Sequence, residues 1–408
     1  MTDDLCQAPA GNEPDRTLDL PPSVPPLRAF YLYLTTGCNL HCRHCWIAPR
    51  FVDGVPSPGA TLDLDALREA VAEARPMGLS GAKLTGGEPL LHPRLREIVE
   101  LLSAEGLSLN METNGVLMTP EMARFLKQDS AVGFVSVSLD GADAATHDAL
   151  RGVAGSFEAA LRGLDHLVAA GYGNVQVIIS LHRGNRSHLE DVARLAAAHG
   201  AASVKINPVT AAGRGGAMHR QGEALDLSER LELDRFVREE LRLRAGVAIV
   251  LSMPLALTPA KELWRTKGRI IECGVRGILG LLGSGEIAMC GIGRVVPELV
   301  YGRLGRDRIR DLWISHPTLL ELRRVLDDVR QFPGICGECV HAAACRTGCV
   351  ANNYVEGKQL VWPSTLCQEA DARGAFPVTR RRVFPVASWR PEGNNTQEEN
   401  HGEGSERY

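Results

Sequence analysis

The stretch Thr35–Trp46, TTGCNLHCRHCW, places three cysteines within eight residues. Cys38, Cys42 and Cys45 have the spacing Cys-x3-Cys-x2-Cys, and no fourth cysteine lies nearby in the sequence. A structural zinc site needs four ligands, and neither histidine inside this stretch gives a familiar zinc spacing. Three thiolates can instead hold a [4Fe–4S] cluster and leave one iron open to an outside ligand. The spacing therefore favours an iron-sulfur cluster, with zinc as the alternative.

The composition is that of a globular protein. The 408 residues are 44% hydrophobic, which is enough for a full-sized core and a second, smaller domain. The formal net charge of −4 gives no electrostatic footprint for nucleic acid or for a membrane surface. No apolar run reaches the roughly 18 residues of a membrane span, and the N-terminus lacks the pattern of a signal peptide. We therefore expect a cytoplasmic protein, in which eleven cysteines indicate metal ligation rather than disulfides.

Four regions differ in character. Residues 1–27 are Pro-rich and polar, and we expect an extended lead-in. Residues 28–250 alternate between strand-like and helix-like segments, whereas residues 251–375 have shorter elements, many glycines and seven of the eleven cysteines. The polar tail, residues 376–408, is expected to be disordered. The sequence thus predicts one α/β domain followed by a small cysteine-rich domain.

The α/β region contains six strand-helix units in series. Strands are predicted at 29–35, 81–84, 107–112, 133–139, 175–181 and 203–207. Helices are predicted at 62–75, 93–106, 119–127, 156–170, 187–200 and 227–243. Such a series forms a parallel sheet, either open or closed into a partial (β/α)6 barrel of the TIM type. The first three cysteines follow the first strand, at the carboxyl end where parallel α/β folds place their active sites.

The cysteine stretch and the segment after the second strand together resemble the radical S-adenosylmethionine (SAM) enzymes. In that family the amino and carboxylate groups of SAM chelate the open iron. Gly86, Gly87, Glu88 and Pro89 resemble the family's motif for the methionine amino group, and glycines allow such close approach of the backbone to a ligand. His44, directly before the last cysteine, has the place of a residue that packs near the adenine. The resemblance implies that the missing fourth ligand is SAM itself.

Further positions match segments that line the SAM pocket in this family. At the end of the fourth strand, Ser136, Ser138 and Asp140 match positions around the ribose, although Asp140 fits a helix or turn cap equally well. The other matches are Glu112 and Asn114 in a recurring segment of uncertain role, Ser180 and Arg183 near the SAM carboxylate, and Asn207 beside the adenine.

The seven C-terminal cysteines form the most specific pattern in the chain. They are Cys273, Cys290, Cys336, Cys339, Cys345, Cys349 and Cys367. A zinc ribbon would explain four cysteines but not seven. The pattern resembles the SPASM domain, which holds two auxiliary [4Fe–4S] clusters in radical SAM enzymes.

The resemblance also implies how these cysteines are shared. The outer auxiliary cluster would take Cys336, Cys339, Cys345 and Cys367. The inner one would take Cys273, Cys290 and Cys349 and would have an open or non-cysteine fourth site. Glu272 is a nearby candidate for that site. Three clusters are therefore expected in all.

The resemblance implies the following function. A SAM-derived 5′-deoxyadenosyl radical would start the oxidative modification, most simply a cross-link, of a ribosomally synthesised precursor peptide, and the auxiliary clusters would remove an electron. The segment LYLTTGCNLHCRHCWIAPRF, residues 32–51, also resembles the maturases of SynChlorMet-type peptide cassettes. Only 37 residues precede the first cluster cysteine, so a separate protein or the barrel itself would bind the leader. An electron donor such as flavodoxin or ferredoxin would complete the system.

Three alternatives remain open at this stage. The first is a sulfatase-type maturase that makes formylglycine, which shares the seven-cysteine pattern. The second is the assembly of a cofactor or small molecule, including haem side-chain chemistry. The third is a non-catalytic iron-sulfur or zinc scaffold, which would not need the SAM-pocket motifs.

Overall fold

A computed structural model describes residues 18–49, 51, 57–265 and 273–382. The described residues do not include Glu272. They also leave out parts of the predicted lead-in and of the predicted tail. Within the described part, no helix is long and apolar enough to cross a membrane.

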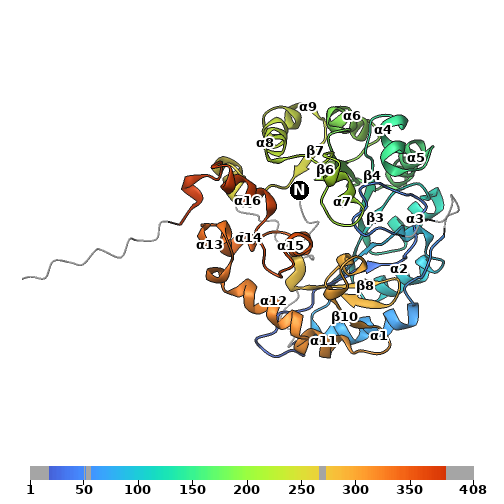
Figure 1. The fold of residues 1–408 in the computed structure, drawn as a ribbon. Helices are drawn as coiled ribbons and strands as arrows, with labels where there is room; N and C mark the ends of the chain where they lie inside the picture. Colours follow the sequence, from blue (N-terminus) through green and yellow to red (C-terminus); the bar gives the residue numbers. More distant parts are fainter. Residues whose placement is uncertain (1–17, 50, 52–56, 266–272, 383–408) are drawn as a thin grey trace, which may run out of the picture.

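The centre of the molecule is a curved sheet whose first seven strands run parallel (Figure 1). They are β1 (Ala29–Tyr33), β2 (Gly81–Thr85), β3 (Ser108–Thr113), β4 (Val132–Ser138), β5 (Gln176–Leu181), β6 (Ser203–Pro208) and β7 (Ala248–Leu251). Side chains alternate between the two faces of each strand. In β1, Phe30 and Leu32 are fully buried in the core, whereas Tyr31 and Tyr33 line the inner cavity.

Helices cover the outer face of this sheet (Figure 1). They are α1 (Leu64–Ala74), α2 (Leu95–Ala104), α3 (Pro120–Gln128), α4 (Ala144–Arg151), α5 (Ser156–Ala169), α6 (Leu189–Ala198) and α8 (Leu227–Phe236), which continues through a π-helical turn (Val237–Leu241) into α9 (Arg242–Arg244). Their apolar faces pack on the sheet, with Leu67, Ile98 and Leu164 among the fully buried residues. The short α7 (Gly215–Arg220) lies instead on the inner side, where His219 lines the cavity. The predicted α/β fold is confirmed, and the main core lies between the helices and the sheet.

The C-terminal region extends the same sheet. β8 (Ile278–Leu282) pairs parallel with β1, and β9 (Glu286–Ala288) and β10 (Val300–Arg303) add antiparallel strands. The order of the ten described strands is β10-β9-β8-β1-β2-β3-β4-β5-β6-β7, so the sheet is open between β7 and β10. The sheet therefore continues across the expected domain boundary near residue 250.

Short helices fill the open side of the curve (Figure 1). They are α10 (Ala260–Arg265), α12 (Pro317–Asp327), α13 (Ile335–Glu338), α14 (Ala342–Cys345), α15 (Val350–Gly357) and α16 (Thr365–Ala372). α11 (Ile309–Ser315) packs instead beside α1, where the Ile309 N–H donates to Glu73 at 2.8 Å. A small apolar cluster joins this group to α8, because Leu227 packs with Ile335, Cys367 and Ala370. The cysteine-rich region is thereby fixed against the end of the parallel sheet.

Candidate active site

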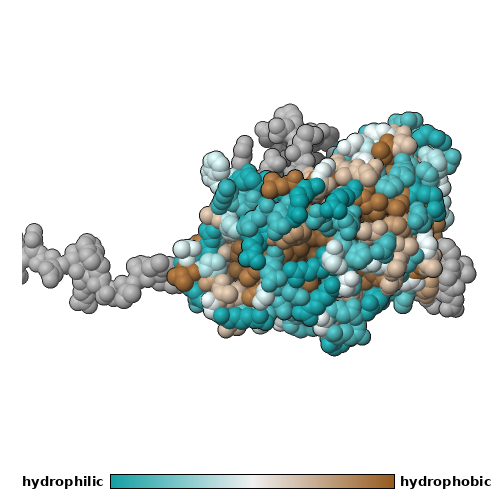
Figure 2. Space-filling view, turned by 90° about the horizontal axis from the view of Figure 1, so that it is seen from above, coloured by the Kyte–Doolittle hydropathy of each residue, from teal (hydrophilic) through white to brown (hydrophobic). Residues whose placement is uncertain are grey.

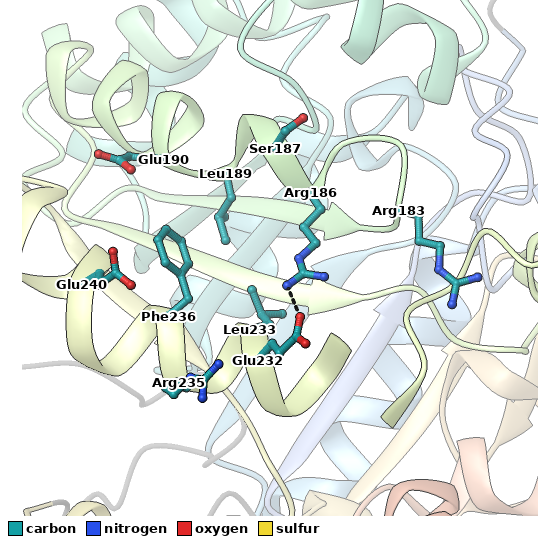
Figure 3. A pocket seen from close by; sticks show the side chains of 10 residues that line it. All are labelled: Arg183, Arg186, Ser187, Leu189, Glu190, Glu232, Leu233, Arg235, Phe236 and Glu240. Carbon is teal, nitrogen blue, oxygen red and sulfur yellow. Dashed lines mark hydrogen bonds and ion pairs between the residues drawn. The ribbon is translucent and has the colours of Figure 1, made fainter. Parts of the chain in front are cut away.

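A cavity of about 1500 Å³ lies inside the curve of the sheet. Its wall combines inward side chains of the parallel strands, the first cysteine stretch and residues of the C-terminal helices. Hydrophilic residues cover much of the outer surface, with apolar residues visible between them (Figure 2). A second cavity of about 570 Å³ lies between α6 and α8, where Arg186 and Glu232 form an ion pair at 3.0 Å (Figure 3). Because no cysteine lines this second cavity, the larger one is the candidate active site.

The first cysteine stretch is held in place by the C-terminal end of α4. The backbone N–H of His41 donates to the carbonyl of Arg151 at 3.0 Å, and that of Arg43 donates to the carbonyl of Leu150 at 2.9 Å. Gly152 follows α4 in the left-handed conformation, with φ at 75°. A Cβ atom on Gly152 would lie 2.7 Å from the carbonyl oxygen of His41. The stretch and α4 thus fit together only with glycine at this position.

The thiols of this stretch lie in a low-polarity environment. Cys38 and Cys42 are buried and Cys45 is half-buried. Burial raises the pKa of both Cys38 and Cys42, so iron would have to replace a thiol proton. A guanidinium N–H of Arg151 donates to Cys42 Sγ at 3.6 Å, and the Asn114 side chain donates to Cys38 Sγ at 3.8 Å. Both contacts favour the thiolate form that a metal needs.

The thiols of the first cysteine stretch have the chemistry of [4Fe–4S] ligands. Among the described residues, no group of three or more His, Cys, Asp and Glu side chains is placed to hold one metal ion. In a [4Fe–4S] cluster each thiolate binds a different iron, so the sulfur atoms need not converge on one point. Two buried thiols and one half-buried thiol that open onto one cavity are the donor set that such a cluster with an outside ligand requires.

The Gly-Gly-Glu-Pro segment packs directly against the cysteine stretch. A Cβ atom on Gly87 would lie 1.6 Å from the carbonyl oxygen of Gly37, and Gly86 has φ at 138°. Only glycine permits this approach and this conformation. The backbone of Gly86 and Gly87 therefore faces the cavity, whereas Pro89 begins a buried 3₁₀ turn (Pro89–Leu91).

Glu88 connects the ends of β2 and β3. Its Oε1 accepts a hydrogen bond from the Thr113 hydroxyl at 2.6 Å, and its Oε2 accepts one from the Asn114 backbone N–H at 2.8 Å. Burial raises the pKa of Glu88, and these two donors oppose that rise. Asn114 also donates through its side chain to Asn39 at 2.8 Å. Glu88 and Asn114 thereby tie the SAM-motif segment to the cysteine stretch.

Asp140 lies behind the cavity wall and does not line it. Its fully buried carboxylate forms an ion pair with Arg151 Nε at 2.6 Å and accepts the Ser180 backbone N–H at 2.7 Å. Burial is the largest single effect and opposes ionisation, but Arg151, two nearby histidines and the Ser180 N–H together lower the pKa of Asp140. The structure thus places Asp140 as the partner of Arg151, whereas Ser136 and Ser138 of β4 line the cavity.

The other residues expected in the SAM pocket are distributed along the same wall. His44, Glu112, Ser180, Arg183 and Asn207 all line the cavity. His44 Nδ1 is buried without a hydrogen-bond partner among the described residues, and burial lowers the pKa of His44 to about 4. Glu112 pairs with Lys83 at 2.5 Å, whereas Arg183 pairs with Glu229 at 2.8 Å near the surface. The neutral imidazole of His44, within the cysteine stretch, is suited to stack against the adenine base of SAM.

Sequence reasoning missed Arg151, which contacts both a cluster cysteine and Asp140. The helix that carries it, α4, was not predicted. Its ends do have recognisable signals, because Asp143 caps the N-terminus through Thr146 N–H at 2.8 Å and Gly152 follows the C-terminus. An Asp and a Gly nine residues apart, directly after the fourth strand, could have indicated this helix.

The inner set of C-terminal cysteines opens onto the same cavity as the first cysteine stretch. Cys273, Cys290 and Cys349 all line it. A hydrogen bond between Cys273 and Cys349 raises the pKa of Cys273 and lowers that of Cys349 to about 7. Burial raises the pKa of Cys290 to about 12. Although protein surrounds Cys349 on most sides, its side chain is accessible from the cavity.

The outer set lies at the far side of the cysteine-rich region. Cys336, Cys339 and Cys367 are buried, and Cys345 is half-buried. Burial, together with the neighbouring Cys345 and Cys339, raises the pKa of Cys336 to about 12. Four thiols are the number that a fully ligated [4Fe–4S] cluster needs. The assignment of these four cysteines to one cluster stays a prediction.

Comparisons with known proteins agree with this site. Residues 32–196 match the model of the radical SAM superfamily. Mycofactocin maturase MftC of Mycobacterium ulcerans is 30% identical over 86% of this chain and 90% of its own length. AdoMet-dependent heme synthase of Methanosarcina barkeri is 30% identical over 79% of this chain and 90% of its own. Streptococcus suis SuiB bound to its precursor peptide SuiA has the same fold, with a TM-score of 0.64 at 14% identity over 85% of this chain and 76% of its own.

The chain belongs to the radical SAM superfamily. It is therefore an enzyme that uses SAM and a [4Fe–4S] cluster. Its C-terminal cysteines are consistent with a SPASM-like domain.

Proposed function

We propose that this enzyme oxidatively modifies a ribosomally synthesised precursor peptide, most simply by forming a cross-link. The observation that carries the proposal is the single cavity shared by Cys38, Cys42 and Cys45 on one side and by Cys273, Cys290 and Cys349 on the other. A substrate between the two groups would be near both. The names of two similar proteins, a mycofactocin maturase and SuiB with its precursor peptide, support a peptide as substrate.

The size of the cavity also supports a peptide. Sites for small ligands usually measure about 300 to 1,000 Å³. The cavity here, about 1500 Å³, has room for SAM and for a further segment of substrate. The similarity to a heme synthase keeps cofactor assembly as the second candidate.

The residues of the chain would have separate tasks. When bound, SAM and its cluster supply a 5′-deoxyadenosyl radical that takes hydrogen from a carbon atom. Cys38, Cys42 and Cys45 would hold that cluster, and Arg151 and Asn114 stabilise its thiolates through the contacts described above. The backbone around Gly86 and Gly87 would receive the methionine end of SAM. His44, Ser136 and Asn207 would surround its adenosine, and the cavity wall would exclude water.

Ten of the eleven cysteines have a place in this proposal. Three would hold the SAM cluster, three the inner and four the outer auxiliary cluster, which makes three [4Fe–4S] clusters. A net two-electron oxidation needs a group that accepts the second electron, and the inner cysteines lie at the substrate cavity for that purpose. We further propose a separate leader-binding protein, a flavodoxin or ferredoxin as electron donor, and the reducing cytoplasm as location.

Counting metal ions tests the proposal. The enzyme is reconstituted without oxygen, and iron, sulfide and zinc are measured for the wild type and for a Cys38→Ala, Cys42→Ala, Cys45→Ala triple variant. Three clusters predict about twelve irons per chain, which fall to about eight in the variant. Cys6→Ala is the control, because it changes the one cysteine that the proposal does not use.

Two results would contradict the proposal. About four irons together with zinc would mean that the C-terminal cysteines are structural. A SAM-dependent product formed from a small molecule, with no mass change in any candidate precursor peptide, would favour cofactor assembly.

A further inference from the structure

Thr347 has an unusual backbone conformation between the two auxiliary cysteine sets. It lies between Cys345 of the outer set and Cys349 of the inner set, and it lines the cavity. Its φ is 67°, and its neighbours Arg346 and Gly348 have φ of 45° and 80°. Three successive residues are therefore left-handed. Glycine adopts this conformation freely, but it is strained for a β-branched residue such as threonine.

The hydroxyl group of Thr347 is also unusual. The residue is only 1% exposed, and its Oγ1 is buried without a hydrogen-bond partner among the described residues. The residue is firmly placed, because the side chain of Asn353 donates to the Thr347 carbonyl at 2.7 Å. The same amide group donates to the Trp362 carbonyl at 2.9 Å. The residue that carries the orphan hydroxyl is thus firmly placed in the cavity wall.

Strain and an unpaired polar group occur together at this one residue, and both are unfavourable. Glycine would remove both, and the chain already uses glycine at the next position. Buried hydroxyl groups in folded proteins normally have an acceptor, and an unpaired one indicates a partner such as a bound ion or cofactor. The cavity that Thr347 lines is also lined by thiols that are expected to hold iron and sulfide, and two of them, Cys345 and Cys349, are two residues away in the sequence.

We propose that the Thr347 hydroxyl donates a hydrogen bond to a sulfur of the inner auxiliary cluster and raises its reduction potential. The proposal rests on the inner cluster of the proposed function. Reduction adds negative charge to a cluster, so a donor to its sulfur atoms stabilises the reduced state. Thr347 would thereby make the inner cluster a better acceptor for an electron that leaves the substrate.

The inner cluster is the better candidate than the outer one. All three inner cysteines line the same cavity as Thr347. Of the outer set only Cys345 does, whereas Cys339 and Cys367 lie in the apolar cluster with Ile335 and Ala370. Thr347 tunes the cluster and is not a catalytic residue, because it does not act on the substrate.

A redox titration followed by electron paramagnetic resonance tests this role. Full-length Thr347→Val, Thr347→Ser and wild-type enzymes are reconstituted, and the signal that disappears in Cys273→Ala is assigned to the inner cluster. We expect Thr347→Val to lower the equilibrium constant for reduction of the inner cluster about tenfold, which lowers its reduction potential by about 59 mV for one electron. The iron content should not change. Thr347→Ser, which keeps the hydroxyl, should match the wild type. Thr258→Val is the matched control, since that cavity-lining hydroxyl already donates to the Pro254 carbonyl at 3.1 Å.

Several outcomes would overturn the proposal. One is an unchanged reduction potential of the inner cluster in Thr347→Val, and another is a shift confined to the outer cluster. A third is an equal shift in Thr347→Ser, which would mean that the backbone and not the hydroxyl sets the potential. If the valine variant does not fold, Thr347→Gly removes the hydroxyl and the strain together and serves in its place. The reduction potentials are measured without substrate, so this test gives a result even if the proposed peptide modification is wrong. If the wild-type enzyme assembles no auxiliary cluster, this inference is wrong. The radical chemistry of the proposed function can still be tested in that case by measuring SAM cleavage.

Discussion

Arg151 and Asp140 form a buried ion pair immediately behind the first cysteine stretch. Their side chains are 7% and 0% exposed, so neither charge is screened by water. Breaking such a pair by removing one partner leaves an uncompensated buried charge. Because Arg151 also donates to Cys42, the pair links the stability of the fold to the state of the cluster thiolates.

We expect Arg151→Gln to lower the free energy of unfolding by about 3 to 5 kcal/mol, since it strands the Asp140 carboxylate. The variant should also bind less iron at the first cluster, because Cys42 loses its charged donor. Urea unfolding and iron analysis measure both effects. Arg124→Gln is the matched control, because the exposed Arg124–Glu121 pair at 3.5 Å should contribute no more than about 1 kcal/mol. If both variants lose the same free energy of unfolding, burial of the Arg151–Asp140 pair does not increase its contribution to stability.

His147 gives a second prediction at the scale of a residue. It is 1% exposed, and its Nδ1 accepts the Asp140 backbone N–H at 3.1 Å. Burial lowers the pKa of His147 to about 4, below the unfolded value of about 6.5. Between these values the unfolded chain binds the extra proton. The stabilisation is therefore complete above about pH 6.5 and is lost as the pH falls through this window.

His147→Asn keeps an acceptor but does not titrate. We expect its free energy of unfolding to fall less than that of the wild type between about pH 7 and pH 5. The quantity to measure at each pH is the difference in free energy of unfolding between variant and wild type, because effects of acid on the clusters then cancel. If the two free energies change in parallel with pH, His147 is not the group responsible.

At the scale of secondary structure, the end of α4 determines the position of the cysteine stretch. Gly152→Ala would introduce strain at a φ of 75° and a contact with the His41 carbonyl. We expect a loss of about 1 to 2 kcal/mol from the strain alone, and weaker SAM binding because the stretch must shift. Gly155→Ala is the matched control, since φ is 82° there and nothing lies within 4 Å of the added Cβ. Calorimetric titration with SAM should separate the two variants, and equal SAM affinity would contradict this role of α4.

The same scale shows what the sequence could predict. All six predicted strands and six predicted helices overlap observed elements, because each is a separate apolar run with turn residues at its ends. The eight-residue α4 was missed, since two turns give little periodicity. Cysteine spacing indicated a [4Fe–4S] cluster at the first cysteine stretch, but not the Arg151 contact or the buried carboxylate of Asp140. Those depend on side chains that meet only after folding.

At the scale of the whole molecule, the pairing of β1 with β8 joins the two halves of the chain. Residues of β8 lie about 250 positions after those of β1, so no local pattern could indicate this contact. Without β8, the β1 edge would expose unpaired backbone groups and the apolar core beside it. We therefore propose that the cysteine-rich region folds together with the parallel strands.

We predict that a chain ending at Leu251 does not fold independently. It should be recovered mainly as aggregate or should lack a cooperative thermal transition, whereas the full chain should unfold in one main transition. Circular dichroism with size-exclusion chromatography checks this, and a chain ending at Arg382 is the control. A monomeric 251-residue product with a sharp transition would show that the two halves are independent.

The central position of β1 has a further consequence for how the enzyme is made. At a synthesis rate of about 5 to 20 residues per second, β8 leaves the ribosome roughly 12 to 50 seconds after β1. During that interval the strand that leads into Cys38 has an unsatisfied edge, which exposes the nascent chain to aggregation. We therefore expect the wall of the first cysteine stretch to be completed only after about two thirds of the 408 residues have been made.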